Sequence, residues 1–431
     1  MHSTRRHRKQ NRKMILPIGK KGIAVEKNAF IAAMASLCIL FVVVVVALIA
    51  KSMNNNPDKK VDITPQNPPE EKEYKTLFET GFMKIGVTIS EDNLFLLRET
   101  PSVDNYYEIN MGIGEELLEK VGIRVKGENN TEDVFENGGT KYSYKLDIDR
   151  YSNKNTLFGL EGINIYNMAE DDSYLGQYVA YKYAEHLGAV IPYYSLALVN
   201  INEEAAEWYF ATEEINDSFI GRVVGNNGTT AGNICLFKAD SNDATLDKKD
   251  NASNYEVEYG KDGSVSYLNK LIEVLNDEKS TPADIEGILD VDSVLKVFAV
   301  NFVVGNYGSY QGQNPDTFYL LYNNGKFTFI QEDYSCAGGN YETDGGLSMS
   351  VSKEKPLYRM EEKDRPLVKK LLSIDDYRIR FYNYVQNLYD YQKSNDVLTA
   401  GEGILRANSG SVCDTEAYKA AVERLKGYIT R

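Results

Sequence analysis

Apolar and polar residues alternate along much of the segment between residues 83 and 215, and this period of two is typical of half-buried β-strands. Strand patterns of this kind cover residues 83–90, 106–114, 122–127, 141–149, 162–168, 193–202 and 207–215. Ser90, Glu91 and Asp92 supply a cap and two first-turn acids for a short helix after the first strand. Residues 173–188 have the spacing of a longer amphipathic helix. A series of strands with an inserted helix indicates an α+β fold rather than regular βαβ alternation.

Helical patterns dominate the second half of the chain. They cover residues 267–276, 282–289, 291–306, 365–392 and 416–429. The helix at 291–306 is apolar around most of its circumference, so we expect it to be buried on nearly all sides. Residues 318–330 predict a hairpin, because the Asn-Asn-Gly sequence at their centre suits its turn. The polar, acidic stretch at 240–263 has no clear period and is predicted to be a surface loop.

The uncharged apolar run at residues 29–50 is long enough to cross a bilayer as a helix, which takes about 20 residues. A cleaved signal peptide is the alternative, but its apolar part would be shorter, about 7 to 15 residues, and would end at a small-residue cleavage site. We therefore expect an uncleaved membrane anchor. The stretch at 51–75, rich in Pro, Asn and charge, is predicted to be a spacer before one folded domain at 76–431.

Charge divides sharply at this apolar run. The tail at residues 1–28 carries nine lysines and arginines against the single acid Glu26, so its net charge is +8, and the total of −15 leaves −23 for the residues after the run. The positive-inside rule then predicts a cytoplasmic tail and an extracytoplasmic main domain. A domain this acidic repels nucleic acid, so the expected partner is the membrane and not a nucleic acid.

Cysteine and histidine are sparse, which excludes several kinds of site. Cys38 lies in the apolar run, and Cys235, Cys336 and Cys413 follow it without a CxxC pair. Neither a zinc ribbon nor a disulfide framework is indicated, and one bridge stays open as an alternative. His186 is the only histidine after the anchor and ends an amphipathic helix, where a cation suits the helix dipole. A histidine-dependent triad and an HExxH zinc site are therefore nearly excluded.

Two adjacent acids end the second strand of the predicted hairpin. Neighbouring residues of a strand face opposite sides, so Glu332 and Asp333 cannot both point into one site. The buried helix ends in a glycine-rich segment at 305–315, and we expect the two loops to lie together. Phosphoryl transfer uses such an arrangement, with one loop to orient the attacking hydroxyl and an acid on the other to hold Mg²⁺. A solvated strand end is the alternative.

Several blocks of the sequence occur in a distinctive order. They are "GIRVKGENN", "GGTKYSYKLDID", "GLEGINIYNM", "YKYAEHLGAVIPYYS", "ATEEINDSFI", "LDVDSVLKVFAVNFVVGNYGSY" and "FYLLYNNGKFTFIQEDYSCAGG". In this order they resemble the blocks of the CotH-type spore-coat kinases, an atypical protein-kinase-like family, from about Met83 to the helices after Arg365. The resemblance implies a bacterial protein with a kinase-like fold that binds ATP with Mg²⁺ or Mn²⁺ and phosphorylates hydroxyls of proteins. Protein substrates or surface proteins are then the expected partners.

The resemblance also assigns a metal ligand. Where the family usually has Pro-Trp-Asp-Tyr with a metal-binding Asp, this chain has Gln331, Glu332 and Asp333 followed by Tyr334. Asp333 is therefore the expected ligand. The two residues before it depart from the family pattern, so the surroundings of the acid are altered.

The loop after the buried helix departs further from the family pattern. The family usually has Asn-Leu-Asp-Ser-Tyr there, with a catalytic Asp, whereas this chain keeps Asn306, expected at the cofactor, and has Gly308 at the place of the acid. Thr317 stands where the family commonly has Asn. Glycine cannot accept a proton, and a positioned base contributes about 10² to 10⁴ in rate. Asp316 is the nearest acid in the sequence that could substitute, and no catalytic residue is assigned.

Nucleotide contacts are expected from the strand-rich half. The resemblance raises Lys145 and Lys126 as phosphate contacts, and Glu213 as the acid that orients such a lysine through an ion pair. Lys141 and Lys145 point away from the apolar face of their strand, so a solvated surface is the alternative reading of that strand.

Three hypotheses about function follow. The first is a membrane-anchored, extracytoplasmic CotH-like kinase domain that is catalytically impaired but keeps affinity for ATP and a divalent metal through Asp333. The second is an active kinase that uses another acid, and the third is a surface-interaction module with no ligand in the cleft. All three share the predicted α+β, kinase-like fold, with a strand-rich first half, a helix-rich second half and one transmembrane helix before them.

Overall fold

The computed structural model describes the chain in several stretches. They are residues 13–16, 23–26, 73–127, 131–152, 155–169, 171–225, 234–249, 252–260, 264–312, 317–339, 357 and 364–430. The chain forms two compact units, Met1–Glu70 and Glu71–Arg431. In the first unit, strands β1 (Lys13–Leu16) and β2 (Ile23–Glu26) pair as an antiparallel hairpin that the sequence pattern does not predict.

The predicted anchor at residues 29–50 lies outside the described residues, as does the predicted spacer up to residue 72. In the stretches that the structure describes, no helix combines the length and the apolar character needed to cross a bilayer. The anchor therefore stays a prediction from the sequence.

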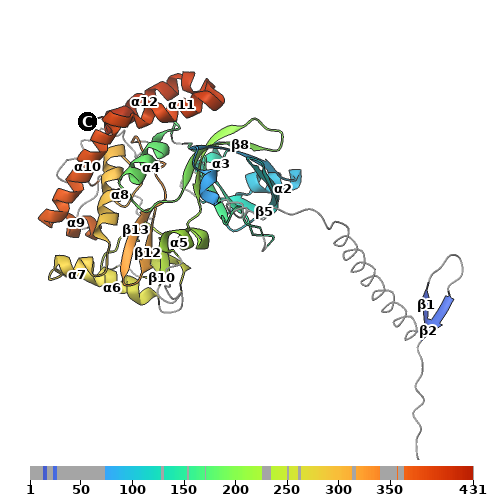
Figure 1. Ribbon diagram of the computed structural model, residues 1–431, viewed down its shortest axis with the longest axis horizontal. Coiled ribbons are helices and arrows are strands. Elements are labelled where there is room, and N and C mark those ends of the chain that lie inside the picture. Colours follow the sequence, from blue (N-terminus) through green and yellow to red (C-terminus); the bar gives the residue numbers. More distant parts are fainter. Residues whose placement is uncertain are drawn as a thin grey trace, which may run out of the picture. The chain divides into compact units, whose positions relative to one another are not determined.

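Seven strands of the second unit form a closed barrel, drawn in blue to green in Figure 1. They are β3 (Phe82–Thr88), β4 (Tyr107–Ile113), β5 (Glu116–Val125), β6 (Tyr144–Asp147), β7 (Gly162–Tyr166), β8 (Tyr194–Ile201) and β9 (Glu207–Glu213). Their order is β3-β4-β5-β6-β7-β9-β8, and the parallel pairing of β3 with β8 closes the barrel. The other neighbours in this barrel pair antiparallel. Closure removes the free strand edges that an open sheet would expose.

The period of two in the sequence fills the interior of this barrel. On β3, for example, Met83, Ile85 and Val87 are buried, and they pack against aliphatic residues of the other strands. Short helices flank the barrel, namely η1 (Tyr74–Leu77), α2 (Glu91–Glu99) and α3 (Thr131–Glu136). The predicted cap of α2 is confirmed, because the Ser90 hydroxyl oxygen accepts a hydrogen bond from the N–H of Asn93 at 3.3 Å.

A four-stranded antiparallel sheet belongs to the helix-rich part of the chain. Its strands are β10 (Ile234–Ala239), β11 (Tyr255–Tyr259), β12 (Phe318–Asn323) and β13 (Lys326–Gln331), in the order β11-β10-β12-β13. The predicted hairpin is β12 and β13. Asn324 and Gly325 have φ values of 49° and 100°, so its turn uses the left-handed region that these two residue types tolerate.

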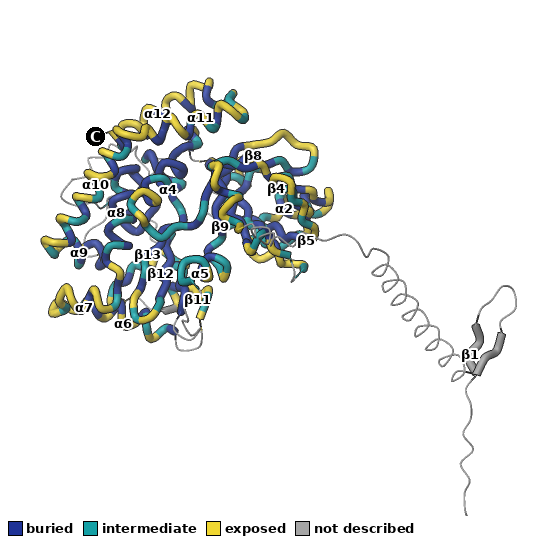
Figure 2. The backbone as a smooth tube through the Cα atoms, in the orientation of Figure 1, coloured by how far each residue is buried: buried dark blue, intermediate teal, exposed yellow. Residues whose placement is uncertain are grey.

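Helices cover this sheet and fill the rest of the second unit. They are α4 (Gly176–His186), α5 (Asp217–Val224), η3 (Ala252–Asn254), α6 (Val265–Asn276), α7 (Pro282–Glu286), α8 (Val291–Val304), α9 (Pro366–Leu372), α10 (Asp375–Asn395), α11 (Val397–Ser409), η5 (Gly410–Asp414) and α12 (Glu416–Ile429). Helix α8 packs against α4, α10, α12 and β13. Figure 2 shows α8 mostly in the colour of buried residues, as its all-round apolar sequence predicts.

The predicted α+β class, with a strand-rich first half and a helix-rich second half, is confirmed. The predicted loop at 240–263 is wrong in part, because η3 and β11 lie within it. On β11 only Tyr255 is buried, so no period of two marks the strand. The sequence pattern also does not predict β10, α5 or α11. Strand β10 is a short, nearly fully buried apolar run, which periodicity alone cannot distinguish from a helix segment.

Candidate functional site

The two loops that were expected to meet are in contact at the ends of α8 and β13. Helix α8 ends at Gly305, whose φ of 67° is left-handed, and Asn306 follows it. The side-chain N–H of Asn306 donates to the backbone carbonyl of Asp333 at 3.3 Å and to Oδ1 of Asn301 at 2.9 Å. The end of the buried helix therefore positions one loop directly against the other.

The carboxylate of Asp333 is half-buried and is held by the turn that follows it. Its Oδ1 accepts the N–H of Ser335 at 2.7 Å, and its Oδ2 accepts the hydroxyl of Ser335 at 2.9 Å. Burial raises the pKa of Asp333, against the opposing effects of the Ser335 hydrogen bonds and the Lys126 ammonium group. The side chain is thus fixed in the loop that contacts Asn306 and does not extend into bulk solvent.

Asn306 offers a second oxygen that suits a divalent cation. Its side chain is fully buried, and its Oδ1 has no hydrogen-bond partner among the described residues. The described stretches contain no group of three or more acid, histidine or cysteine side chains arranged to hold a metal by themselves. Mg²⁺, however, commonly binds one or two carboxylates together with phosphate oxygens and water. Asp333 and Asn306 therefore fit an ion that arrives with a phosphate ligand.

Glu332 has partners of its own, as strand alternation predicts for two adjacent acids. Its Oε1 lies 3.1 Å from Nζ of Lys126 and accepts a hydrogen bond from the side-chain N–H of Asn164 at 3.1 Å. Burial opposes the charged form, but the ammonium groups of Lys126 and Lys238 together hold the pKa of Glu332 below its ordinary value. A buried, charged pair therefore joins the end of β13 to the residue that follows β5.

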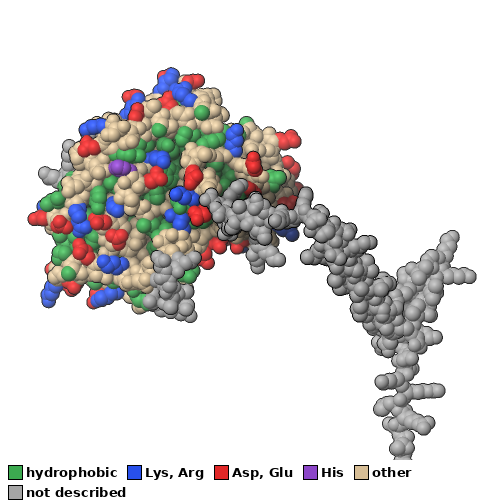
Figure 3. Space-filling view, viewed as in Figure 1, with side chains coloured by type: hydrophobic (Ala, Val, Ile, Leu, Met, Phe, Trp, Pro, Cys, Tyr) green, Lys and Arg blue, Asp and Glu red, His purple; other side chains and the backbone are tan. Residues whose placement is uncertain are grey.

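Lys145 also pairs with a carboxylate, but not with the predicted one. Its ammonium group lies against Glu214, whereas Glu213 forms an ion pair with Arg222 at 2.6 Å. The predicted ion pair between Glu213 and a site lysine is therefore wrong. Both lysines expected at the phosphates, Lys126 and Lys145, are paired with acids, and Figure 3 shows acidic and basic side chains intermixed on the face that it draws.

The strand register explains this exchange of partners. Lys145 on β6 lies opposite Asn164 on β7, which lies opposite Thr212 on β9, so these three side chains share one face of the sheet. Residues two positions apart on a strand share a face. Glu214 is therefore on the face of Lys145, and Glu213 is on the other.

Asp147 is two positions from Lys145 on β6, and neighbouring acids raise its pKa. Burial, followed by the carboxylates of Glu214 and Asp149, raises the pKa of Asp147 to about 6. The folded state then holds a proton that the unfolded chain has released, so Asp147 destabilises the fold as the pH rises from about 4 to about 6. We expect Asp147→Asn to increase the free energy of unfolding by about 1 kcal/mol near pH 7.5, after allowance for partial exposure, and to have no such effect near pH 4. Urea unfolding at the two pH values measures this, and an equal gain at both would contradict it.

A family model described as CotH kinase protein matches residues 123–399. The chain belongs to the CotH kinase protein family. The resemblance inferred from the sequence blocks is thus confirmed, and no curated protein matches the chain. The matched range begins within β5 and ends within α11, so it contains every predicted site residue, from Lys126 to Asp333.

The positions that depart from the CotH pattern contact one another. The side-chain N–H of Gln331 donates to Oγ1 of Thr317 and to the backbone carbonyl of Asp333, both at 2.8 Å. The Thr317 hydroxyl donates to the backbone carbonyl of Gly308 at 3.2 Å, and the N–H of Glu332 donates to the carbonyl of Thr317 at 3.2 Å. These departures therefore form one hydrogen-bonded network that holds both CotH loops.

A cysteine is packed against Gly308. A Cβ placed at Gly308 would lie 2.6 Å from Sγ of Cys336 and 3.3 Å from its Cβ. The φ of Gly308 is not in the left-handed region, so its backbone would otherwise accept a side chain. Cys235, Cys336 and Cys413 are buried thiols that form no disulfide with one another, so the bridge left open by the sequence is not formed among them. The sulfur therefore occupies the space that a side chain at position 308 would need.

Sequence reasoning does not single out Glu214, Asn164 or Cys336. Strand alternation separates Glu213 from Glu214, but the choice between them needs the pairing of β6, β7 and β9. Cys336 has no sequence signal, because its role comes from a contact with the distant Gly308. The alternative acid Asp316 lies outside the described residues.

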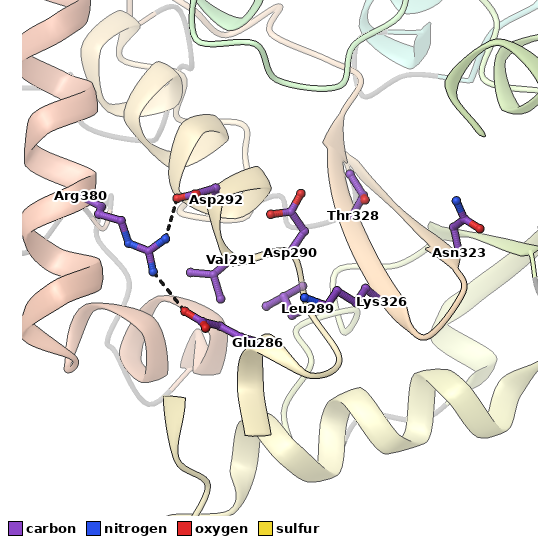
Figure 4. A pocket seen from close by; sticks show the side chains of 9 residues that line it. All are labelled: Glu286, Leu289, Asp290, Val291, Asp292, Asn323, Lys326, Thr328 and Arg380. Atoms are coloured by element: carbon purple, nitrogen blue, oxygen red, sulfur yellow. Dashed lines mark hydrogen bonds and ion pairs between the residues drawn. The ribbon is translucent and has the colours of Figure 1, made fainter. Parts of the chain in front are cut away.

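A cavity of about 520 Å³ lies at the start of α8 and contains none of the predicted site residues (Figure 4). It is lined by Glu286, Leu289, Asp290, Val291, Asp292, Asn323, Lys326, Thr328 and Arg380. The guanidinium group of Arg380 already pairs with Asp292 at 3.0 Å and with Glu286 at 3.4 Å. Asp290 caps α8 by accepting the N–H of Ser293. Most of the charged side chains that line this cavity are thus engaged in ion pairs or in the helix cap.

Proposed function

We propose that this chain is a membrane-anchored CotH-like domain with an atypical kinase-like fold, which binds ATP with Mg²⁺ or Mn²⁺ weakly and transfers phosphate slowly or not at all. The apolar run at 29–50 and the basic tail before it support an anchor with the main domain outside the cytoplasm. Membership of the CotH kinase protein family supports nucleotide chemistry. The barrel lies beside the helix-rich part, and Lys126 of the barrel part forms an ion pair with Glu332 of the helix-rich part. This two-part arrangement supports the kinase-like fold.

One observation carries the impaired activity. Gly308 stands where the CotH loop has its catalytic acid, and the sulfur of Cys336 fills the space beside it. Asp333 and Asn306, in contrast, are kept and lie in contacting loops. The site has thus lost its proton acceptor while it retains oxygens for a cation.

These residues divide the work of a kinase site between them. Asp333 and Asn306 would hold the cation, and Lys126 and Lys145 would face the phosphates. A bound cation would neutralise charge on the phosphates during transfer. Gly308 has no group that can take the proton of an attacking hydroxyl, and the loss of such a base costs about 10² to 10⁴ in rate.

A surface-interaction module without a ligand is the second candidate. It is favoured by the pairing of Lys126 with Glu332 and of Lys145 with Glu214, because both phosphate candidates are already neutralised. An active kinase would need another acid, and Asp316 is the candidate from the sequence.

Binding and transfer assays on the full-length chain in detergent test the proposal. We expect measurable ATP binding in the presence of Mg²⁺ or Mn²⁺, and we expect Asp333→Ala to weaken it at least about tenfold, because the ion loses its carboxylate. Asp104→Ala, which removes an exposed acid before β4, is the matched control and should change nothing. Labelled ATP should give little protein phosphorylation.

The two alternatives predict other outcomes of the same assays. Rapid incorporation of label that Asp333→Ala abolishes would show an active kinase. Failure of every variant to bind ATP would leave the interaction module.

A further inference from the structure

We infer that Glu332 is an internal substitute for a phosphate group: its carboxylate occupies Lys126, and this ion pair must open before a phosphate-bearing ligand can bind Lys126. The inference rests on the proposed function, because it concerns the same site. It adds an autoinhibitory contact that is built into the end of β13.

The geometry around Glu332 is that of a bound anion. Lys126 lies 3.1 Å from Oε1, Asn164 donates to the same oxygen at 3.1 Å, and only 7% of the Glu332 side chain is exposed. The hydroxyl of Tyr181 donates to the backbone carbonyl of Glu332 at 2.6 Å, so the main chain is fixed as well. The Tyr166 ring lies 5.1 Å from Nζ of Lys126 and covers the cation. The lysine is therefore held towards the carboxylate and not towards solvent.

A phosphate ligand would compete with Glu332 for one ammonium group. Charge-assisted hydrogen bonds from a lysine suit a carboxylate and a phosphate alike. If the ligand bound Lys126, Glu332 would stay buried with its charge and would lose its ion-pair partner, while the hydrogen bond from Asn164 remained, which is a costly state. Binding of phosphate is therefore linked to opening of the pair, and the measured affinity equals the affinity of the open form multiplied by the fraction of chains in which the pair is open.

The position of Glu332 in the chain makes this contact specific to the altered site. The family resemblance leads us to expect Trp at this position, before the expected metal ligand, and Trp carries no charge that could neutralise a lysine. Here that residue is an acid, it precedes Asp333 directly, and its N–H donates to the carbonyl of Thr317 at 3.2 Å. The Thr317 hydroxyl in turn donates a hydrogen bond to the backbone carbonyl of Gly308. Opening the ion pair would thus disturb both loops of the site.

Glu332→Gln in the full-length chain tests the inference, because it removes the charge and keeps an oxygen for Asn164. We expect this variant to bind inorganic tripolyphosphate, and ATP with Mg²⁺, about tenfold more tightly than the natural chain in calorimetry. Glu204→Gln is the matched control, since it makes the same change of charge. It removes the carboxylate that pairs with Arg98 at 2.6 Å in the barrel part. It should leave both affinities unchanged.

Two further measurements keep the inference testable if Glu332→Gln is unstable. Glu332→Asp keeps the charge but retracts the carboxylate by one methylene, and it should give an intermediate affinity for tripolyphosphate. Acylation of Lys126 by an amine reagent, followed by mass spectrometry, should be faster in both variants than in the natural chain, because the ammonium group is less firmly held. Bound tripolyphosphate should slow it again.

The outcomes separate this inference from the proposed function. Equal tripolyphosphate affinities of the natural chain and both Glu332 variants overturn the inference, even if ATP binds and depends on Asp333. Faster acylation of Lys126 without tighter phosphate binding overturns it as well. Tighter binding of tripolyphosphate to Glu332→Gln supports the inference, and if ATP binds to no variant, the same experiment rejects the proposed nucleotide site alone.

Discussion

The double variant Gly308→Asp/Cys336→Ala is expected to transfer phosphate to protein about 10² to 10⁴ times faster than the natural chain, because it supplies a proton acceptor and the space for it. Gly308→Asp alone should gain little. The new Cβ would lie 2.6 Å from the sulfur of Cys336, so the variant should lose about 1 to 3 kcal/mol of stability through overpacking. Initial rates of label incorporation from ATP and Mg²⁺, together with urea unfolding, measure both effects.

A matched variant isolates the role of the new carboxylate. Gly308→Asn/Cys336→Ala has nearly the same shape but cannot accept a proton at neutral pH, so it should stay as slow as the natural chain. A gain of equal size with Asn would show that the effect comes from repacking and not from a base. If Gly308→Asp alone were as stable as the natural chain, Cys336 would not be the obstacle. Adding Asp333→Ala to the fast variant should abolish the gain.

Glu213→Ala is expected to lower the free energy of unfolding by about 3 to 5 kcal/mol, because it leaves a largely buried arginine without its anion. The Glu213 carboxylate is fully buried and binds Arg222 through two N–H groups, at 2.6 and 3.2 Å. It also accepts the hydroxyl of Tyr74 at 2.6 Å and the N–H of Tyr193 at 3.0 Å. These contacts tie the start of the described domain to β8, β9 and α5. Urea unfolding with a constant m-value measures the loss.

The neighbouring acid provides the control. Glu214→Ala removes the partner of Lys145, but it also relieves the repulsion that raises the pKa of Asp147. We expect its cost to be smaller, about 1 kcal/mol. If the two variants lost the same free energy of unfolding, the different roles given to these acids would be wrong: Glu213 as a residue that stabilises the fold, and Glu214 as the partner of Lys145.

Local patterns were sufficient for many elements of this protein. Residues 416–429 are predicted to be a helix, and α12 has those bounds. The all-round apolar character of 291–306 predicts the burial of α8, and the Asn-Asn-Gly sequence predicts the turn between β12 and β13. These features depend on interactions within a few residues, such as capping, left-handed turn residues and the period of apolar positions.

Closure of the barrel could not be predicted in the same way. Alternation identifies the strands, but each strand of a barrel could pair with several others. The parallel pairing of β3 with β8 joins segments that are separated by most of the strand-rich half. The sequence pattern does not predict β11, because only one of its residues is buried. It does not predict β10 either, because nearly every residue of that strand is buried.

The candidate site shows the same division. Alternation predicts that Glu332 and Asp333 have different partners, and the contact of Asn306 with the Asp333 loop agrees with the expected meeting of the two loops. Which acid serves which lysine depends on strand register, so the sequence favoured Glu213 where the fold uses Glu214. The sulfur of Cys336 beside Gly308 has no local signal at all.

Local sequence patterns are sufficient for the α+β class, for most helices and strands and for the family resemblance, and they place glycine at position 308, where the resemblance leads us to expect an acid. The folded chain is needed to show that Lys126 is paired with Glu332, that Lys145 is paired with Glu214 and that Cys336 packs against Gly308. The reason is physical: apolar period and capping act between neighbours in the chain, whereas ion pairs and steric contacts depend on which surfaces the folded chain brings together.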